Sequence, residues 1–167
     1  ECEHGGRSIE ALGRRLEWID RRGDVIAADV LDAWFSPPPE VLQALRDGLD
    51  WIVRTSPPAF PAGLVEKISE ARGVPAACVV PGAGSSDLID RAFRGWLGPS
   101  SRALVADPAH GEYAHVLGGV LRCGVDRCFL EKSRGYRLDV ERLREGIRKA
   151  YDLVVLMNPN NSTGRLI

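Results

Sequence analysis

Apolar residues recur along the chain at two spacings, which predict helices and strands respectively. Spacings of three and four residues, with polar residues between them, are typical of amphipathic helices. They occur at residues 9–19, in a segment from Val41 to Ile52 that follows three prolines, and at residues 63–72, 86–97, 111–121 and 139–150. Short apolar runs predict strands at residues 24–31, 78–80, 102–106, 125–130 and 153–157.

Helices and strands alternate regularly from residue 78 onward. This order is typical of crossover units, in which parallel strands form a sheet that helices cover on both faces. The stretch Thr55–Pro61 holds several prolines and predicts an irregular connection before this region. The pattern therefore predicts an α/β fold with a mainly parallel sheet, preceded by a helical segment.

Composition and charge narrow the range of partners. With 44% hydrophobic residues, 27% charged residues and a net charge of −1, the chain resembles an ordinary soluble globular protein. Neither nucleic acid nor an anionic membrane is favoured as a partner, and the apolar runs are too short to span a bilayer. The four cysteines lack the paired spacing of a zinc site, so no metal is expected. Reduced thiols and a cytoplasmic location are expected.

A glycine-rich turn joins the predicted strand 78–80 to the predicted helix 86–97. Gly82 and Gly84 allow close approach of the backbone to a ligand, and Ser85 and Ser86 stand where a helix presents unpaired N–H groups. Such a turn can bind an anion, and phosphate suits it. It lacks the lysine of a nucleotide P-loop and the third glycine of a dinucleotide fingerprint. The alternative is a glycine turn with a serine cap and no ligand.

An asparagine-rich loop, Asn158–Gly164, follows the last predicted strand. Ligands bind at the carboxyl ends of strands in open parallel sheets, and asparagine can hold a ligand oxygen without adding charge. The alternative is an Asn-Pro turn with local side-chain hydrogen bonds.

This loop resembles the N-P-N-N-P-T-G signature of pyridoxal-phosphate (PLP) enzymes of fold type I, in the aminotransferase class I/II superfamily. It is most similar to that of the histidinol-phosphate aminotransferase and threonine-phosphate decarboxylase groups. The resemblance implies that Asn161 binds the phenolic oxygen of PLP, with Ser162 in place of the proline.

Two further segments resemble the same family in the same order. Gly82–Ile89 is similar to its phosphate-binding turn, which makes Gly84, Ser85 and Ser86 the expected phosphate contacts. Asp107–Tyr113 is similar to its D-P-T-Y-x-x-Y segment, so that His110 is expected to stack on the pyridine ring. The alternative for His110 is a surface histidine, and Tyr113 is expected to pack within its helix.

The amino-terminal third resembles the family less closely. His4-Gly5-Gly6 is similar to the start of the phosphothreonine-decarboxylase branch. Trp34 and Phe35 replace an asparagine-rich motif, and they either line an apolar substrate wall or anchor the segment on the core. Thr55 or Ser56 could replace a tyrosine that reaches the partner subunit's cofactor in dimeric relatives.

The family's Schiff-base lysine follows the asparagine-rich loop, and Lys67, Lys132 and Lys149 do not occupy its position. The resemblance thus implies the front part of an enzyme, with its catalytic lysine expected beyond Ile167. Residues 1–53 are expected to form an amino-terminal segment that belongs to the small domain and serves as substrate and dimer arm, and residues 54–167 the first half of the PLP-binding large domain.

The function implied is a PLP-dependent aminotransferase, in the family habit a homodimer, that acts on an amino acid or amine and a keto acid. The alternatives are a PLP-dependent decarboxylase and a non-catalytic relative that binds a phosphate compound.

Overall fold

The computed structural model describes residues 7–13, 15, 17–28, 33 and 35–167. They fall into two compact units, and the boundary between the units lies between Val79 and Val80. We refer to these as the amino-terminal and the carboxyl-terminal unit. The predicted division into residues 1–53 and 54–167 stays a prediction.

The amino-terminal unit contains helices and no strand among its described residues. Its elements are α1 (Arg7–Glu10), the 3₁₀ turn η1 (Ile19–Asp24), α2 (Pro39–Arg54), α3 (Ala62–Arg72) and the 3₁₀ turn η2 (Ala76–Cys78). The predicted helices after the prolines and after residue 62 are confirmed. Pro39 occupies the first turn of α2, where its missing N–H is not needed, and α3 ends at Gly73 in the left-handed conformation.

Three predictions in this unit need correction. The helix expected at residues 9–19 ends at Glu10, because Gly13 has a φ of +86° that a right-handed helix cannot contain. No strand forms at residues 25–28, and residues 29–31 lie outside the described part of the chain. The strand expected at residues 78–80 is absent, because the N–H groups of Cys78 and Val79 bond locally to Pro75 and Ala76.

The residues of this unit that were predicted to contact a substrate or the cofactor are exposed, half-buried or outside the described part of the chain. His4–Gly6 and Trp34 lie outside the described residues. Phe35 is 63% exposed, and the hydroxyl of Thr55 donates to the carbonyl of Trp51 at 2.6 Å. Nothing in this unit tests the proposed role of Thr55 or of Ser56.

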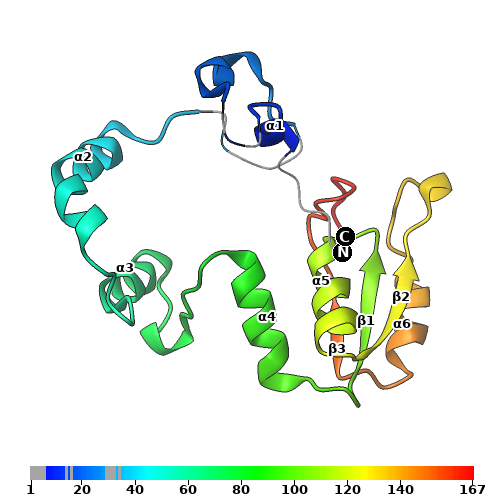
Figure 1. Cartoon of the computed structure of the whole chain (residues 1–167). Helices are drawn as coiled ribbons and strands as arrows, with labels where there is room; N and C mark the ends of the chain where they lie inside the picture. Colours follow the sequence, from blue (N-terminus) through cyan, green and yellow to red (C-terminus); the bar gives the residue numbers. More distant parts are fainter. Residues whose placement is uncertain (1–6, 14, 16, 29–32, 34) are drawn as a thin grey trace. The chain divides into compact units, whose positions relative to one another are not determined.

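The carboxyl-terminal unit has the predicted α/β architecture (Figure 1). Its elements are α4 (Ser85–Trp96), β1 (Arg102–Asp107), α5 (Gly111–Ala114), the π-helix η3 (His115–Val120), β2 (Gly124–Phe129), the 3₁₀ turn η4 (Lys132–Arg134), α6 (Val140–Ile147) and β3 (Leu153–Val155). The strands lie in the order β2-β1-β3 and all pairs are parallel. The predicted helix 111–121 changes from α to π geometry at His115. The predicted helix 139–150 is shorter than expected and covers Val140–Ile147.

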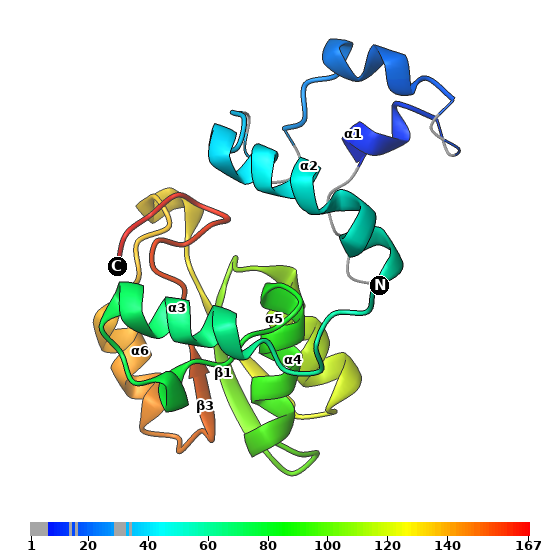
Figure 2. The ribbon, with the colours of Figure 1, turned by 90° about the vertical axis from the view of Figure 1, so that its left-hand side faces the viewer.

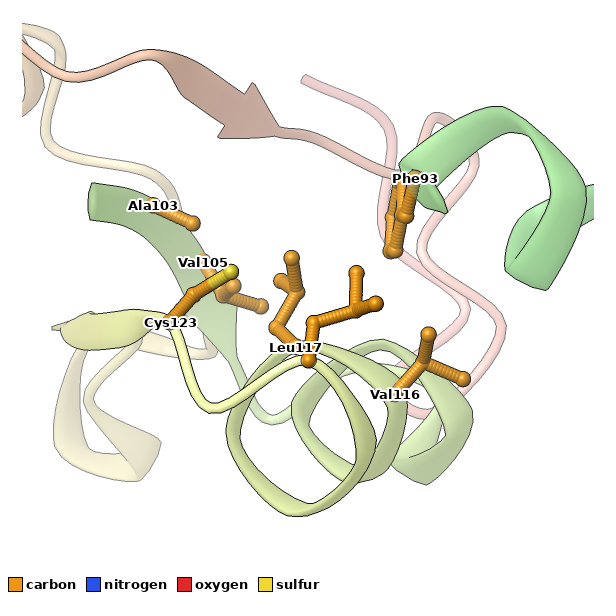
Figure 3. Close-up of a cluster of buried hydrophobic side chains, with 7 residues drawn as sticks. Phe93, Ala103, Val105, Val116, Leu117 and Cys123 are labelled. Atoms are coloured by element: carbon orange, nitrogen blue, oxygen red, sulfur yellow. The ribbon is translucent and has the colours of Figure 1, made fainter. Parts of the chain in front are cut away.

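The central strand β1 is buried on both faces, which explains its uninterrupted apolar sequence. Ala103 and Val105 contribute to a core with residues of α4 and η3, and Leu104 packs with Cys128 and Leu143 on the opposite face. In Figure 2, α6 lies on one side of the sheet and α4 and α5 lie on the other. Figure 3 shows Leu117 of η3 between Phe93 and the side chains of β1. No helix in the described ranges is both long and apolar enough to cross a membrane.

Candidate functional site

Three loops of the carboxyl-terminal unit carry the residues that the sequence indicated. They are the turn 81–86 before α4, the segment 107–110 after β1, and the loop 156–164 after β3. The chain passes down α4 and returns up β1, so α4 begins near the edge of the sheet where β1 ends (Figure 1). This is the edge at which open parallel sheets bind ligands.

The turn before α4 requires glycine at two positions for different reasons. Gly84 has φ +94° and ψ 175°, a conformation available essentially only to glycine. A Cβ atom at Gly82 would lie 2.6 Å from Cδ2 of Leu88 and 2.7 Å from Oδ2 of Asp87. One glycine therefore provides a backbone conformation and the other provides space.

Two charged residues of α4 form hydrogen bonds to the backbone of this turn. The carboxylate of Asp87 accepts a hydrogen bond from the N–H of Ala83 at 2.9 Å. Arg91 donates to the carbonyl of Pro81 at 3.1 Å and lies 3.5 Å from the same carboxylate. Asp87 and Arg91 were not predicted from the sequence, although their spacing of four along a helix is a recognisable signal for an ion pair.

The turn has the donors that a phosphate group needs. No described side chain caps α4, so the N–H groups of its first turn remain available, and the helix dipole favours an anion there. Ser85 is exposed and Ser86 is half-buried, and each adds a hydroxyl donor. The charge of Asp87 is balanced by Arg91 and by the N–H of Ala83. The residues present therefore fit a phosphate.

His110 stands directly before α5, at the cap position. Its ring meets the ring of Tyr113 edge to face, with 5.8 Å between centroids. The ring centroid of Tyr113 in turn lies 6.3 Å from that of Phe93, and Tyr113 packs against the core rather than only within its own helix. His110 is half-buried, and its ring is thus supported from the core side by aromatic contacts.

The asparagine-rich loop presents one asparagine and buries its neighbour. Asn161 is exposed, and its side-chain amide has no hydrogen-bond partner among the described residues, whereas its N–H points to the sulfur of Met157 at 3.0 Å. Asn160 is 4% exposed, and its Nδ2 donates to the carbonyl of Pro108 at 2.7 Å. The loops that carry His110 and Asn161 are thus joined directly. Asn160 was not predicted from the sequence as a site residue.

Shifted pKa values occur among described groups outside these three loops. Tyr151 donates a hydrogen bond of 2.6 Å to Asp126, and Arg102 donates one of 2.7 Å to the same oxygen. These bonds lower the pKa of Asp126, and the bond to Asp126 raises the pKa of Tyr151. Hydrogen bonds from Arg134 and from the N–H of Arg142 lower the pKa of Asp139, and burial raises the pKa of the Cys128 thiol.

Tyr151→Phe is expected to raise the pKa of Asp126 toward its ordinary value, because the phenol is the largest cause of the lowering. A lowered pKa stabilises the folded state above the unfolded pKa of about 4, and this contribution disappears as the pH falls through the folded pKa. The stability difference between the wild type and the variant should therefore shrink in acid. Carbon NMR titration of the carboxyl groups measures the pKa of Asp126 in the wild type and in the variant. The pKa of Asp139 should be the same in both proteins. An unchanged Asp126 would contradict the assignment.

Lysine is missing from all three loops. Lys67 forms an ion pair with Glu70 at 2.7 Å within α3, and Lys132 and Lys149 are exposed. Within the described ranges, no group of three or more His, Cys, Asp or Glu side chains is placed to hold a metal ion. The three loops thus offer N–H and hydroxyl donors, a planar ring and an exposed amide, and they contain no lysine.

The chain is similar to known proteins over most of its length. Residues 29–167 match the family "Aminotransferase class I and II". The chain is 30% identical over 162 residues to histidinol-phosphate aminotransferase 1 of Thiobacillus denitrificans, covering 97% of this chain and 40% of that protein. The chain thus spans less than half the length of this relative.

Solved structures show the same fold over similar shares. N-succinyldiaminopimelate aminotransferase from Mycobacterium tuberculosis aligns with a TM-score of 0.69 at 25% identity, over 82% of this chain and 38% of that one. Histidinol-phosphate aminotransferase from Sinorhizobium meliloti, in complex with pyridoxal-5'-phosphate, aligns with a TM-score of 0.66 at 21% identity, over 78% of this chain and 34% of that one. With its parallel sheet and the family match over most of its length, the chain belongs to the aminotransferase class I and II family.

Proposed function

We propose that these residues form the cofactor-binding front part of a PLP-dependent aminotransferase that acts on an amino acid or amine and a keto acid. Histidinol-phosphate aminotransferase from Sinorhizobium meliloti, which has the same fold, was solved in complex with pyridoxal-5'-phosphate. The observation that carries the proposal is the hydrogen bond from Asn160 Nδ2 to the carbonyl of Pro108, which joins the loop of Asn161 to the loop of His110. The glycine turn before α4 lies near the same edge of the sheet (Figure 1).

Each part of the site has a separate task. The first-turn N–H groups of α4, with the hydroxyls of Ser85 and Ser86, hold the phosphate. His110 would stack on the pyridine ring, and the edge-to-face contact with Tyr113 would keep the His110 ring in place. The Nδ2 of Asn161 donates a hydrogen bond to the phenolic oxygen and adds no charge.

PLP, when bound, supplies an electron-withdrawing ring that stabilises negative charge at the substrate's α-carbon. The residues described here orient that ring and hold its phosphate and phenolic groups. The lysine that the family uses for catalysis is proposed to come from a part of the protein that these residues do not include. Homodimer formation likewise stays a prediction. Analysis of the product, as keto acid or as amine, distinguishes transamination from decarboxylation.

Asn161→Ala in the full-length protein is expected to weaken PLP binding by about 10-fold or more, because a hydrogen bond to a charged oxygen contributes roughly 1.5–3 kcal/mol. The absorption spectrum of the bound cofactor should also change, since the substitution removes a donor to its chromophore. Titration with PLP followed by absorbance measures both.

Asn158→Ala is the matched control, because Asn158 is an exposed amide in the same loop and its Oδ1 accepts from the N–H of Ile167. Its PLP affinity should stay close to the wild-type value. Equal effects of the two substitutions would remove the specific role of Asn161, and a wild-type protein that binds no PLP would refute the proposed function.

A further inference from the structure

Asn160 is one of two polar or charged residues that are buried in the described part of the chain. It is 4% exposed, and a buried amide costs free energy unless its donors and acceptors are satisfied. The hydrogen-bond partners of the Asn160 side chain therefore indicate its structural role.

The side chain of Asn160 connects two loops that are far apart in the sequence. Its Nδ2 donates to the carbonyl of Pro108 at 2.7 Å. Its Oδ1 accepts from the N–H of Ser162 at 3.0 Å, which closes a short turn around Asn161. A single side chain thus contacts the segment that leads to His110 and the turn that presents Asn161.

The main chain of Asn160 holds the base of the same loop. Its N–H donates to the carbonyl of Arg165 at 2.7 Å, and its carbonyl accepts from the N–H of Gly164 at 2.7 Å. Asn161 consequently projects from a loop that is held at both ends. Movement of Asn160 would displace Asn161 and would release the segment of Pro108.

We propose that Asn160 is a positioning residue that sets the placement of His110 relative to Asn161. The inference rests on the proposed function, because it assigns these two residues to one ligand. An amide is suited to the task because it donates to one loop and accepts from the other. A carboxylate in its place would face the Pro108 carbonyl with an acceptor, and a serine would be too short to reach that carbonyl.

The first experiment compares two isosteric substitutions in the full-length protein. Asn160→Asp keeps the acceptor for Ser162 and loses the donor to Pro108, and it should weaken PLP binding by about 10-fold or more. Asn158→Asp is the matched control, because it makes the same chemical change at an exposed position whose only side-chain hydrogen bond among described residues is an accepted one. Equal PLP affinities for the two variants would overturn the inference.

Lowering the pH should partly reverse the defect. Once protonated, the carboxyl introduced by Asn160→Asp can donate to the Pro108 carbonyl, and burial raises its pKa. The PLP dissociation constant of Asn160→Asp, divided by that of Asn158→Asp, should therefore decrease as the pH is lowered from about 8 to about 5.5. A ratio that stays constant or grows over this range would overturn the role of the donor, because simple destabilisation by the substitution predicts no recovery.

Hydrogen exchange in the cofactor-free protein tests the link between the loops without relying on PLP. Asn160→Ser removes the reach to Pro108 and keeps a hydroxyl that can accept from Ser162. Exchange should become faster in residues 109–113 as well as in 160–165, whereas Asn158→Asp should leave residues 109–113 unchanged.

The outcomes separate the two proposals. If residues 109–113 exchange at the wild-type rate in Asn160→Ser, Asn160 does not hold them and the inference fails, even if the protein binds PLP. If the wild-type protein binds no PLP, the proposed function fails and the assignment of a positioning role fails with it. Asn160→Ser also provides the PLP comparison if Asn160→Asp does not fold, and wild-type affinity in this variant would again overturn the inference.

Discussion

Leu117→Ala is expected to lower the free energy of unfolding by about 2–5 kcal/mol, a large fraction of a typical domain's stability. Leu117 is fully buried and is the largest such side chain among the described residues. It lies between Phe93 of α4 and the apolar face of β1 (Figure 3). Truncation removes apolar contacts and leaves a cavity that the surrounding strand and helix can fill only in part.

Chemical denaturation followed by circular dichroism measures this loss. Val120→Ala in the same π-helix is the control, because Val120 is 39% exposed and its truncation should cost less than about 1 kcal/mol. If the two substitutions lowered stability equally, Leu117 would not be at the centre of the core that joins α4 to the sheet.

Gly84→Ala is expected to weaken PLP binding by about 5- to 150-fold in the full-length protein. Nothing lies within 4 Å of a Cβ atom at this position, so the effect comes from the backbone, which has a φ of +94°. A side chain in this conformation costs roughly 1–3 kcal/mol. The turn is expected to relieve this strain by rotating its peptide groups, and its N–H groups would then no longer converge on the phosphate.

Gly95→Ala is the matched control in the same helix. A Cβ atom there also meets nothing within 4 Å, and its φ lies outside the left-handed range. Alanine is a better helix former than glycine, so the control should be stabilised by up to about 1 kcal/mol and should bind PLP normally. Calorimetric titration with PLP and thermal unfolding provide the two measurements. Normal PLP affinity in Gly84→Ala would show that the turn does not form the phosphate site.

Helices and strands with strong periodicity were predictable, and the weakly determined ones were not. The apolar run in β1 and the amphipathic pattern of α2 and α4 follow directly from residue spacing. The expected strand at residues 78–80 was wrong because a strand needs a partner, and the N–H groups of Cys78 and Val79 instead bond to Pro75 and Ala76. The expected helix at residues 9–19 failed at Gly13, whose φ a periodicity argument does not evaluate.

For the candidate site, the sequence by itself determined the chemical groups and their order along the chain. Glycines before a helix, a planar ring after one strand and asparagines after another are local features, and they were sufficient to indicate the family. The tertiary structure decided which asparagine is presented and which is buried, because Asn160 and Asn161 are chemically identical and differ only in their neighbours. Likewise, only the folded chain shows that Asn160 joins two loops and that Asp87 and Arg91 hold the glycine turn. Hydrogen bonds between distant segments depend on where the backbone places each group, and residue spacing alone does not contain that information.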